Sequence, residues 1–218
     1  MKLYEIFFNK ILNLFSKKDL KSIEKEVLKK DNSFPINVGS VLKIDTIDTK
    51  SIRFNVLEVC ENEVSLGGKF NKFKDYILSG DQDNLKLRFF KDLKGRERFI
   101  LLKQHDALEY DEGFHDLVKN SQEFEMHDDL NDDDEKNDIH EKFWRVNDVK
   151  ISYKTKVKIL DSEQLVSNKS YEYLDFSRIT KVDSVEVEEF VFVEMDTETG
   201  MFVIWRGMEI PSGRIVAF

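Results

Sequence analysis

The stretch that decides the fold is Val185–Met195 (VEVEEFVFVEM) together with Met201–Trp205 (MFVIW). Both runs are rich in β-branched and aromatic residues, which favour β-strands. The residues between them, Asp196–Gly200, supply side-chain acceptors for local turns and a glycine for a position with positive φ. The two runs therefore predict an antiparallel hairpin, the strongest in the chain.

Outward from this hairpin, the same strand signal recurs from Ile36 onward. Several runs alternate apolar and polar residues or lie between turn signals, as half-buried strands do. They are Val41–Ile47, Ile52–Val59, Leu85–Phe89, Arg98–Leu102, Phe143–Val146, Thr155–Leu160 and Ser170–Asp175. Turn residues 91–96 predict a second hairpin between Leu85–Phe89 and Arg98–Leu102, and a short helix is expected around Phe114–Val118. We expect one or two packed antiparallel sheets.

Residues 1–33 have a different period. At ~100° per residue, the large apolar side chains of residues 1–18 gather on one wide helical face. The segment from Asp19 to about Lys30 predicts a second helix, and Pro35 ends the helical region because it pushes the preceding residue out of the helical basin. We therefore expect an α+β chain, mainly antiparallel β, with N-terminal amphipathic helices followed by a β-rich body.

Charge is distributed unevenly over the 218 residues, whose net charge is −9. Residues 1–30 hold eight lysines against four acids, whereas residues 106–141, the acidic belt, hold fifteen acids against two lysines. An acidic belt repels phosphate backbones, so we expect no nucleic-acid partner. The single cysteine, Cys60, excludes an intramolecular disulfide and a cysteine-based zinc cluster, and a reducing cytoplasm is the expected location.

These features divide the chain into four parts. They are an N-terminal amphipathic helical segment (1–33), a first β-rich unit (34–126), an acidic loop (127–141) and a second β-rich unit (142–218). A duplication of one β unit is an open alternative. Its only local echo is Phe143-Trp-Arg-Val146 beside Ile204-Trp-Arg-Gly207, where we expect core tryptophans and exposed arginines.

Motifs for catalysis, nucleotides or metals fail a check of their spacing. An EF-hand frame started at Asp129 puts Asp134 where the glycine belongs and His140 where the bidentate glutamate belongs. The best metal candidate is Asp111, Glu112 and His115, because Gly113 would allow a tight turn that gathers the three side chains. We nevertheless expect no enzymatic activity, no resident metal and no cofactor.

The C-terminal quarter resembles a known family. Asp175-Phe-Ser-Arg178, Glu189-Phe-Val-Phe-Val-Glu194 and the ending Ile210-Pro-Ser-Gly-Arg214 are similar to the end of the uncharacterised bacterial YjfK-like proteins. The resemblance covers residues 170–218 and extends loosely to the hairpin of residues 85–102. It implies a cytoplasmic protein encoded near a phage-shock-protein-A-like membrane-stress protein and small membrane proteins. It implies no activity and no functional residue.

Together these observations predict a non-enzymatic bacterial accessory protein, peripheral to the inner membrane or bound to a membrane-stress protein. Apolar side chains of the first helix would insert into the interface, with lysines near anionic headgroups. The residues expected to contact membrane or partner are Phe7, Phe8, Ile11, Leu14, Phe15, Lys2 and Lys10. The same helix face could instead cover the chain's own core or a subunit interface.

Two other functions stay open. The acidic belt could dock a basic protein partner through Asp132, Asp133 and Asp134. Alternatively, the protein could be a metal-dependent enzyme that uses Asp111, Glu112 and His115.

Overall fold

The structure is a computed structural model that describes residues 36–45, 51–66, 72–79, 84–92, 94–128, 139–147, 150–159, 168–182 and 185–218. Its elements, in chain order, are β1 (Val41–Asp45), β2 (Ser51–Leu66), β3 (Lys72–Leu78), β4 (Leu85–Lys91), β5 (Glu97–Leu108), α3 (Glu112–Asn120), β6 (Glu123–Asp128), β7 (Ile139–Arg145), β8 (Ile151–Ile159), β9 (Asn168–Val182), β10 (Val185–Asp196), β11 (Phe202–Ile210), the short 3-10 helix η1 (Ser212–Arg214) and β12 (Ile215–Ala217).

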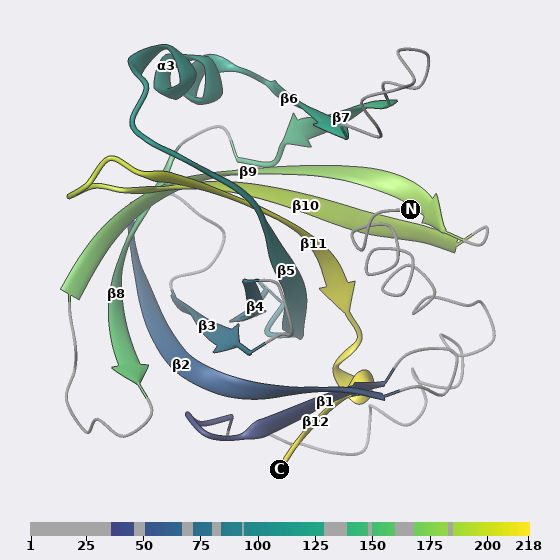
Figure 1. Ribbon diagram of the computed structural model, residues 1–218. Coiled ribbons are helices and arrows are strands. Elements are labelled where there is room, and N and C mark those ends of the chain that lie inside the picture. Colours follow the sequence, from purple (N-terminus) through teal and green to yellow (C-terminus); the bar gives the residue numbers. More distant parts are fainter. Residues whose placement is uncertain are drawn as a thin grey trace.

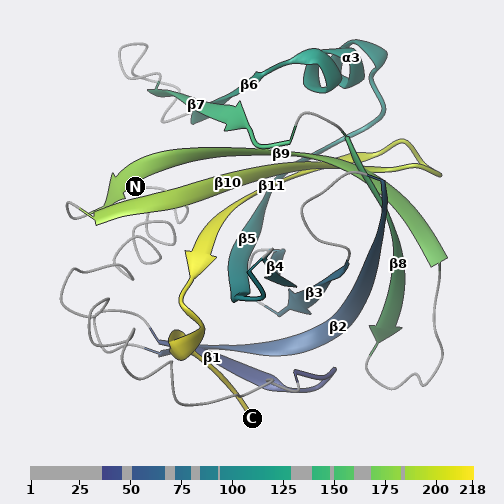
Figure 2. The same cartoon turned by 180° about the vertical axis from the view of Figure 1, so that it is seen from behind.

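Eight of these strands close into a ring. The hydrogen-bonded order β2-β3-β4-β5-β11-β10-β9 is completed by β8, which pairs with both β9 and β2. Every pair in the ring is antiparallel. β2 pairs with three strands because it is long: Ser51–Asn55 pair with β1, Val56–Glu63 with β3 and Glu58–Leu66 with β8. Figures 1 and 2 show the ring from opposite sides.

The elements stack in four layers around three cores. In Figure 1, α3 and the β6–β7 hairpin lie above β9, β10 and β11, β3 and β4 lie in the middle, and β1 and β12 lie below with the first part of β2. The first core fills the space between the lowest layer and the outer face of β3, β4 and β5, the middle core lies inside the ring, and the third core lies under α3 and β6–β7.

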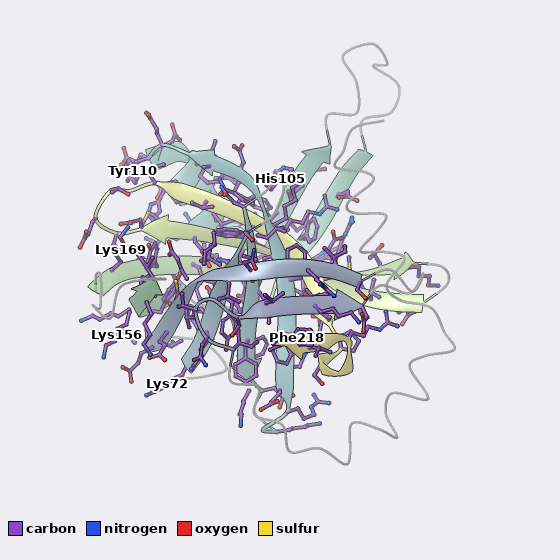
Figure 3. All side chains as sticks on the ribbon, turned by 60° about the horizontal axis from the view of Figure 1, so that its bottom comes forward. Lys72, His105, Tyr110, Lys156, Lys169 and Phe218 are labelled. Atoms are coloured by element: carbon purple, nitrogen blue, oxygen red, sulfur yellow. The ribbon has the colours of Figure 1, made fainter. Side chains whose placement is uncertain are left out.

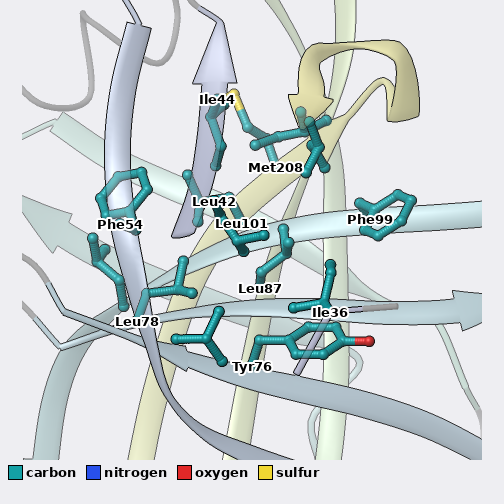
Figure 4. Packing of buried hydrophobic residues seen from close by; sticks show 14 of the residues in the cluster. Ile36, Leu42, Ile44, Phe54, Tyr76, Leu78, Leu87, Phe99, Leu101 and Met208 are labelled. Carbon is teal, nitrogen blue, oxygen red and sulfur yellow. The ribbon is translucent and has the colours of Figure 1, made fainter. Parts of the chain in front are cut away.

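The first core is purely aliphatic and aromatic at its centre. Figure 4 shows Leu42 and Ile44 of β1 packed against Leu87 of β4 and Leu101 of β5, with Met208 of β11 closing one side. Leu42, Leu87 and Met208 are fully buried. Burial of such side chains stabilises the fold by about 1.5–3 kcal/mol each, so this core attaches the lowest layer to the ring.

β4 is buried on both faces, and this burial places two charged side chains inside the ring. Leu85 and Leu87 enter the first core, so the alternation of a strand turns Lys86 and Arg88 into the middle core. On the outer surface of the ring the same alternation exposes lysines: Lys72 and Lys156 project into solvent in Figure 3. Lys72 forms a 3.4 Å ion pair with Glu63 of β2.

The predicted hairpins are confirmed. β10 and β11 pair over Glu189–Met195 and Phe202–Met208, and Gly200 in their turn has φ of 76°. β4 and β5 pair through Lys91 and Glu97 at the turn. The short helix expected around Phe114–Val118 is α3, which begins after the capping side chain of Asp111.

The α+β assignment is wrong. The described chain is mainly antiparallel β, with α3 as its single α-helix, and its strands form one sheet. The N-terminal amphipathic helices expected in residues 1–33 lie outside the described residues, and nothing in the structure supports them. Helical periodicity over 33 residues weighed too heavily in that assignment, because a pattern compatible with a helix does not supply the tertiary packing that stabilises one.

Strands from residues 34–126 and 142–218 alternate in the sheet. β2 of the first range pairs with β8 of the second, and β5 of the first pairs with β11 of the second. The division of the sequence into two β-rich units stays a prediction. Backbone hydrogen bonds of the ring join strands from both ranges.

Gly207 of β11 provides a test of the ring's packing. A Cβ atom placed there would lie 1.9 Å from the carbonyl oxygen of Leu101 on β5, so Gly207→Ala forces two hydrogen-bonded strands apart. We expect it to lower the free energy of unfolding by about 3 kcal/mol or more, measured by urea denaturation.

The matched control is Gly95→Ala in the β4–β5 turn. Gly95 has φ of +76° and nothing within 4 Å of its added Cβ, so only backbone strain of about 1 kcal/mol is expected. Equal losses for the two variants would contradict the close approach of β5 and β11.

Candidate functional site

Four charged side chains lie buried together in the middle core. They are Asp75 of β3, Lys86 and Arg88 of β4, and Glu194 of β10, and we call them the buried charge cluster. Arg88 has no exposed surface and Glu194, the most exposed of the four, retains 6%. Two positive and two negative charges make the cluster electrically neutral.

Every carboxylate in the cluster contacts both cations. Arg88 donates from Nε and Nη2 to the two oxygens of Asp75, each at 2.8 Å, and from Nη2 to Glu194 at 2.5 Å. Lys86 donates to Glu194 at 2.7 Å, and its Nζ lies 3.7 Å from Asp75. This bidentate geometry with partners on both sides is what allows charges to remain ionised away from water.

The strand register explains how distant residues meet. Asp75 and Arg88 are direct cross-strand partners on β3 and β4, so their side chains leave the sheet on the same face. Glu194 reaches them across the ring from β10, more than 100 residues later in the chain. The cluster therefore forms only when the ring has closed with β10 in its correct position.

Aromatic rings enclose the two cations. The guanidinium of Arg88 lies 4.4 Å from the ring centroid of Phe73 and 4.6 Å from that of Phe192, and Lys86 Nζ lies 4.0 Å from the ring of Trp205. Ring faces carry partial negative charge, so they stabilise buried cations in place of water.

The pKa values of the cluster show which effect dominates. Burial alone raises the pKa of Asp75, but the charges of Arg88 and Lys86 exceed that effect and hold it below its ordinary value. Burial lowers the pKa of Lys86 despite the opposing carboxylates, and the pKa of Arg88 is raised because its two carboxylates outweigh its burial. Asp75 and Arg88 are thus ionised together at neutral pH.

A pocket of about 270 Å³ opens beside the cluster. It lies between the β4–β5 hairpin on one side and β9 and β10 on the other, with Arg88 among its lining residues. The lining consists of Arg88, Phe90, Asp92, Lys94, Arg96, Arg98, Ile100, Val146, Asn147, Asp175, Glu188, Phe190 and Phe192. The lining therefore combines apolar side chains with charged ones, and two of the charged residues, Arg88 and Asp175, are buried.

Arg88 has hydrogen-bonding capacity left over. In the described part of the chain, Nη1 of Arg88 is buried and has no hydrogen-bond partner, although Nε and Nη2 are both used. An unpaired buried donor costs about 1–3 kcal/mol. Tyr173 Oη and Trp205 Nε1 also lack partners among the described residues, but neither residue lines this pocket.

Ion pairs engage several residues of the pocket's lining. Arg98 forms a bidentate pair with Glu209 and lies 3.7 Å from Glu188, while Arg96 pairs with Asp92 at 2.7 Å. Near them, Asn147 donates to both oxygens of Asp175. These contacts hold the polar side chains of the lining in fixed positions beside the apolar ones.

A second buried cluster lies in the third core and has a structural role. Glu189 accepts from Arg206 at 2.7 Å and from Arg178 at 2.6 Å, and both arginines also contact Glu141 of β7. These ion pairs connect β7 to β9, β10 and β11.

Arg206 is 3% exposed and Trp144 is 54% exposed, so the expectation of core tryptophans with exposed arginines is wrong for these residues.

The three predicted metal candidates lie at the start of α3. Asp111 caps α3 by accepting from the backbone N–H of Phe114, Glu112 is exposed, and His115 Nδ1 lies 3.8 Å from Asp116. Among the described residues, no group of three His, Cys, Asp or Glu side chains is placed to hold a metal ion.

The other predicted site residues lie outside the described residues. They are Lys2, Phe7, Phe8, Lys10, Ile11, Leu14 and Phe15 of the N-terminal segment and Asp132, Asp133 and Asp134 of the acidic loop. No helix in the described part of the chain is long and apolar enough to cross a lipid bilayer.

Sequence reasoning missed the buried charge cluster. Lys86 and Arg88 alternate with leucines, and this pattern ordinarily marks a strand with one face in water. The signal that could have found it is the reciprocal pattern in β10, where Glu194 interrupts a run of phenylalanine and valine.

Comparison with known proteins gave no match: no family model, no curated protein and no solved structure is similar to the chain. The resemblance to the YjfK-like proteins therefore stays a prediction.

The cluster's contribution to stability can be measured with Glu194→Gln. Removal of this charge leaves Lys86 without its closest carboxylate in the middle core, so we expect a loss of about 3–5 kcal/mol in the free energy of unfolding. Glu61→Gln is the control, because Glu61 pairs with Lys74 and Lys158 on the surface, and its loss is expected to stay below about 1 kcal/mol. Similar losses would show that the cluster is hydrated.

The buried thiol of Cys60 predicts that the free energy of unfolding decreases at alkaline pH. Cys60 faces the middle core beside Asp75, and burial, followed by the charges of Asp75 and Glu58, raises the pKa of its thiol from 9.0 to about 12. Because the unfolded thiol ionises first, stability is complete below pH 9 and falls between pH 9 and 12 by about 1.4 kcal/mol per pH unit. In urea titrations under reducing conditions, Cys60→Ala should have a shallower slope by that amount. Superimposable slopes would refute the buried thiol.

Proposed function

We propose that the protein binds a small, largely apolar molecule in the pocket beside the buried charge cluster. The observation that carries this proposal is Nη1 of Arg88, a fully buried donor without a partner in the described part of the chain, on a residue that lines the pocket. A ligand with an acceptor atom would satisfy this donor and recover the free energy that the unpaired group costs.

The size and lining of the pocket support binding. Its volume of about 270 Å³ is close to the lower end of the range for small-molecule sites, and its walls include Phe90, Ile100, Phe190 and Phe192. Closed antiparallel sheets of eight strands have interiors that side chains can fill or that can hold one small ligand. Here the buried charge cluster fills part of that interior and the pocket lies beside it.

The lining residues are suited to holding a molecule in place. The pocket combines apolar contact with donors fixed by ion pairs, which is the usual composition of binding sites. Preorganised donors bind without first losing side-chain entropy, because Arg88 is already held by Asp75 and Glu194.

The functions predicted from sequence stay predictions. A basic partner on Asp132, Asp133 and Asp134 and association with the inner membrane depend on residues outside the described part of the chain. A phage-shock-protein-A-like partner rests on the family resemblance alone. The accessory role is compatible with small-molecule binding, since a bound molecule could regulate contact with a partner.

A fluorescence titration with prodan tests the proposal. Prodan is a neutral naphthalene dye with a ketone oxygen, and its emission moves to shorter wavelength in apolar surroundings. We expect a saturable blue shift with the full chain. Val146→Trp should weaken binding at least tenfold, because Val146 lines the pocket and the larger indole takes up part of its volume.

The control is Val216→Trp on β12. Val216 is also half-buried, but it pairs with Lys43 on a strand remote from the pocket lining, so the variant should bind prodan as the parent does. Absence of a saturable shift in the parent protein, or unchanged binding in a folded Val146→Trp variant, would overturn the proposal.

A further inference from the structure

We propose that the ligand of this pocket is uncharged and presents a carbonyl-type oxygen to Arg88. This inference rests on the proposed function and adds the chemical class of the ligand. It follows from the charges that already surround Arg88, from the ion pairs that the other guanidinium groups of the lining already form, and from the apolar side chains of the lining.

Charge balance around Arg88 leaves no excess positive charge for an anion. Arg88 and Lys86 face the carboxylates of Asp75 and Glu194, so the buried charge cluster is neutral before a ligand enters. A carboxylate or phosphate placed beside it would bring an unbalanced negative charge into a water-poor site, close to two existing carboxylates. Burial of a charge without compensation is strongly unfavourable.

The other guanidinium groups of the lining are already engaged by acids. Arg98 contacts Glu209 and Glu188, and Arg96 contacts Asp92. The lining also includes the buried carboxylate of Asp175. An incoming anion would have to displace one of these partners or approach their negative charge, so Arg96 and Arg98 do not make an anion site. The remaining basic residue of the lining, Lys94, is exposed to solvent.

The group that Arg88 offers defines the complementary atom. A guanidinium only donates, and Nη1 is the atom of Arg88 without a partner in the described chain, so the ligand must accept. A ketone, amide, ester or lactone oxygen accepts without carrying charge. Phe190 and Phe192 of β10 and Phe90 of β4 line the same pocket and favour a flat or aromatic body for the rest of the molecule.

The test is a competition between two molecules that differ in charge and little else. Naphthalene-2-carboxamide and naphthalene-2-carboxylate share the ring and the position of the carbonyl carbon, but only the second is anionic at neutral pH. Each is titrated against prodan bound to the full chain, in parallel with the Val146→Trp and Val216→Trp variants.

We expect the amide to displace prodan at a concentration at least tenfold lower than the carboxylate, in the parent protein and in Val216→Trp. Equal displacement, or stronger displacement by the carboxylate, would overturn the neutral-ligand inference while leaving the binding pocket intact. If prodan itself shows no saturable shift that Val146→Trp removes, the proposed function fails and the inference fails with it.

Discussion

The contact of Arg88 with Asp75 and Glu194 is the constraint on which the rest of the structure depends. Transfer of four charged groups out of water costs several kcal/mol for each ion, and only complete pairing offsets that cost. The three side chains come from β3, β4 and β10, so the pairing requires correct register between β3 and β4 and closure of the ring by β10. A slip of one residue in β4 would turn Arg88 into the apolar first core.

β4 couples stability to the proposed binding site. Leu85 and Leu87 on one face attach the lowest layer, whereas Arg88 on the other face belongs both to the buried charge cluster and to the pocket lining. The same guanidinium is therefore held by two carboxylates and still has a free donor among the described residues. Such a group is rigid before a ligand arrives, which favours selective binding over adaptable binding.

Local signals in the sequence predicted the local structure well. Gly200 and the strand-forming runs around it located the β10–β11 hairpin, and turn residues between Lys91 and Glu97 located the β4–β5 hairpin. Closure of the ring could not be predicted, because the β2–β8 and β5–β11 pairs join residues far apart in sequence. The buried polar face of β4 could not be predicted either, because its alternation looks the same whether that face meets water or a cluster of opposite charges. The pocket depends on ring closure and on the buried polar face of β4, so the sequence alone did not reveal it. Helical periodicity in residues 1–33 led to a wrong assignment of the fold class.

NMR of the arginine side chains tests the central claim most directly. With ¹⁵N-labelled arginine, and with the Arg88 signals assigned from an Arg88→Lys variant, exchange of side-chain hydrogens with water is compared for Arg88 and the exposed Arg96. Our account predicts slow exchange at Arg88 and rapid exchange at Arg96, with prodan shifting the signals of Arg88. Exchange at Arg88 as rapid as at Arg96, or Arg88 signals that saturating prodan leaves unchanged, would contradict it.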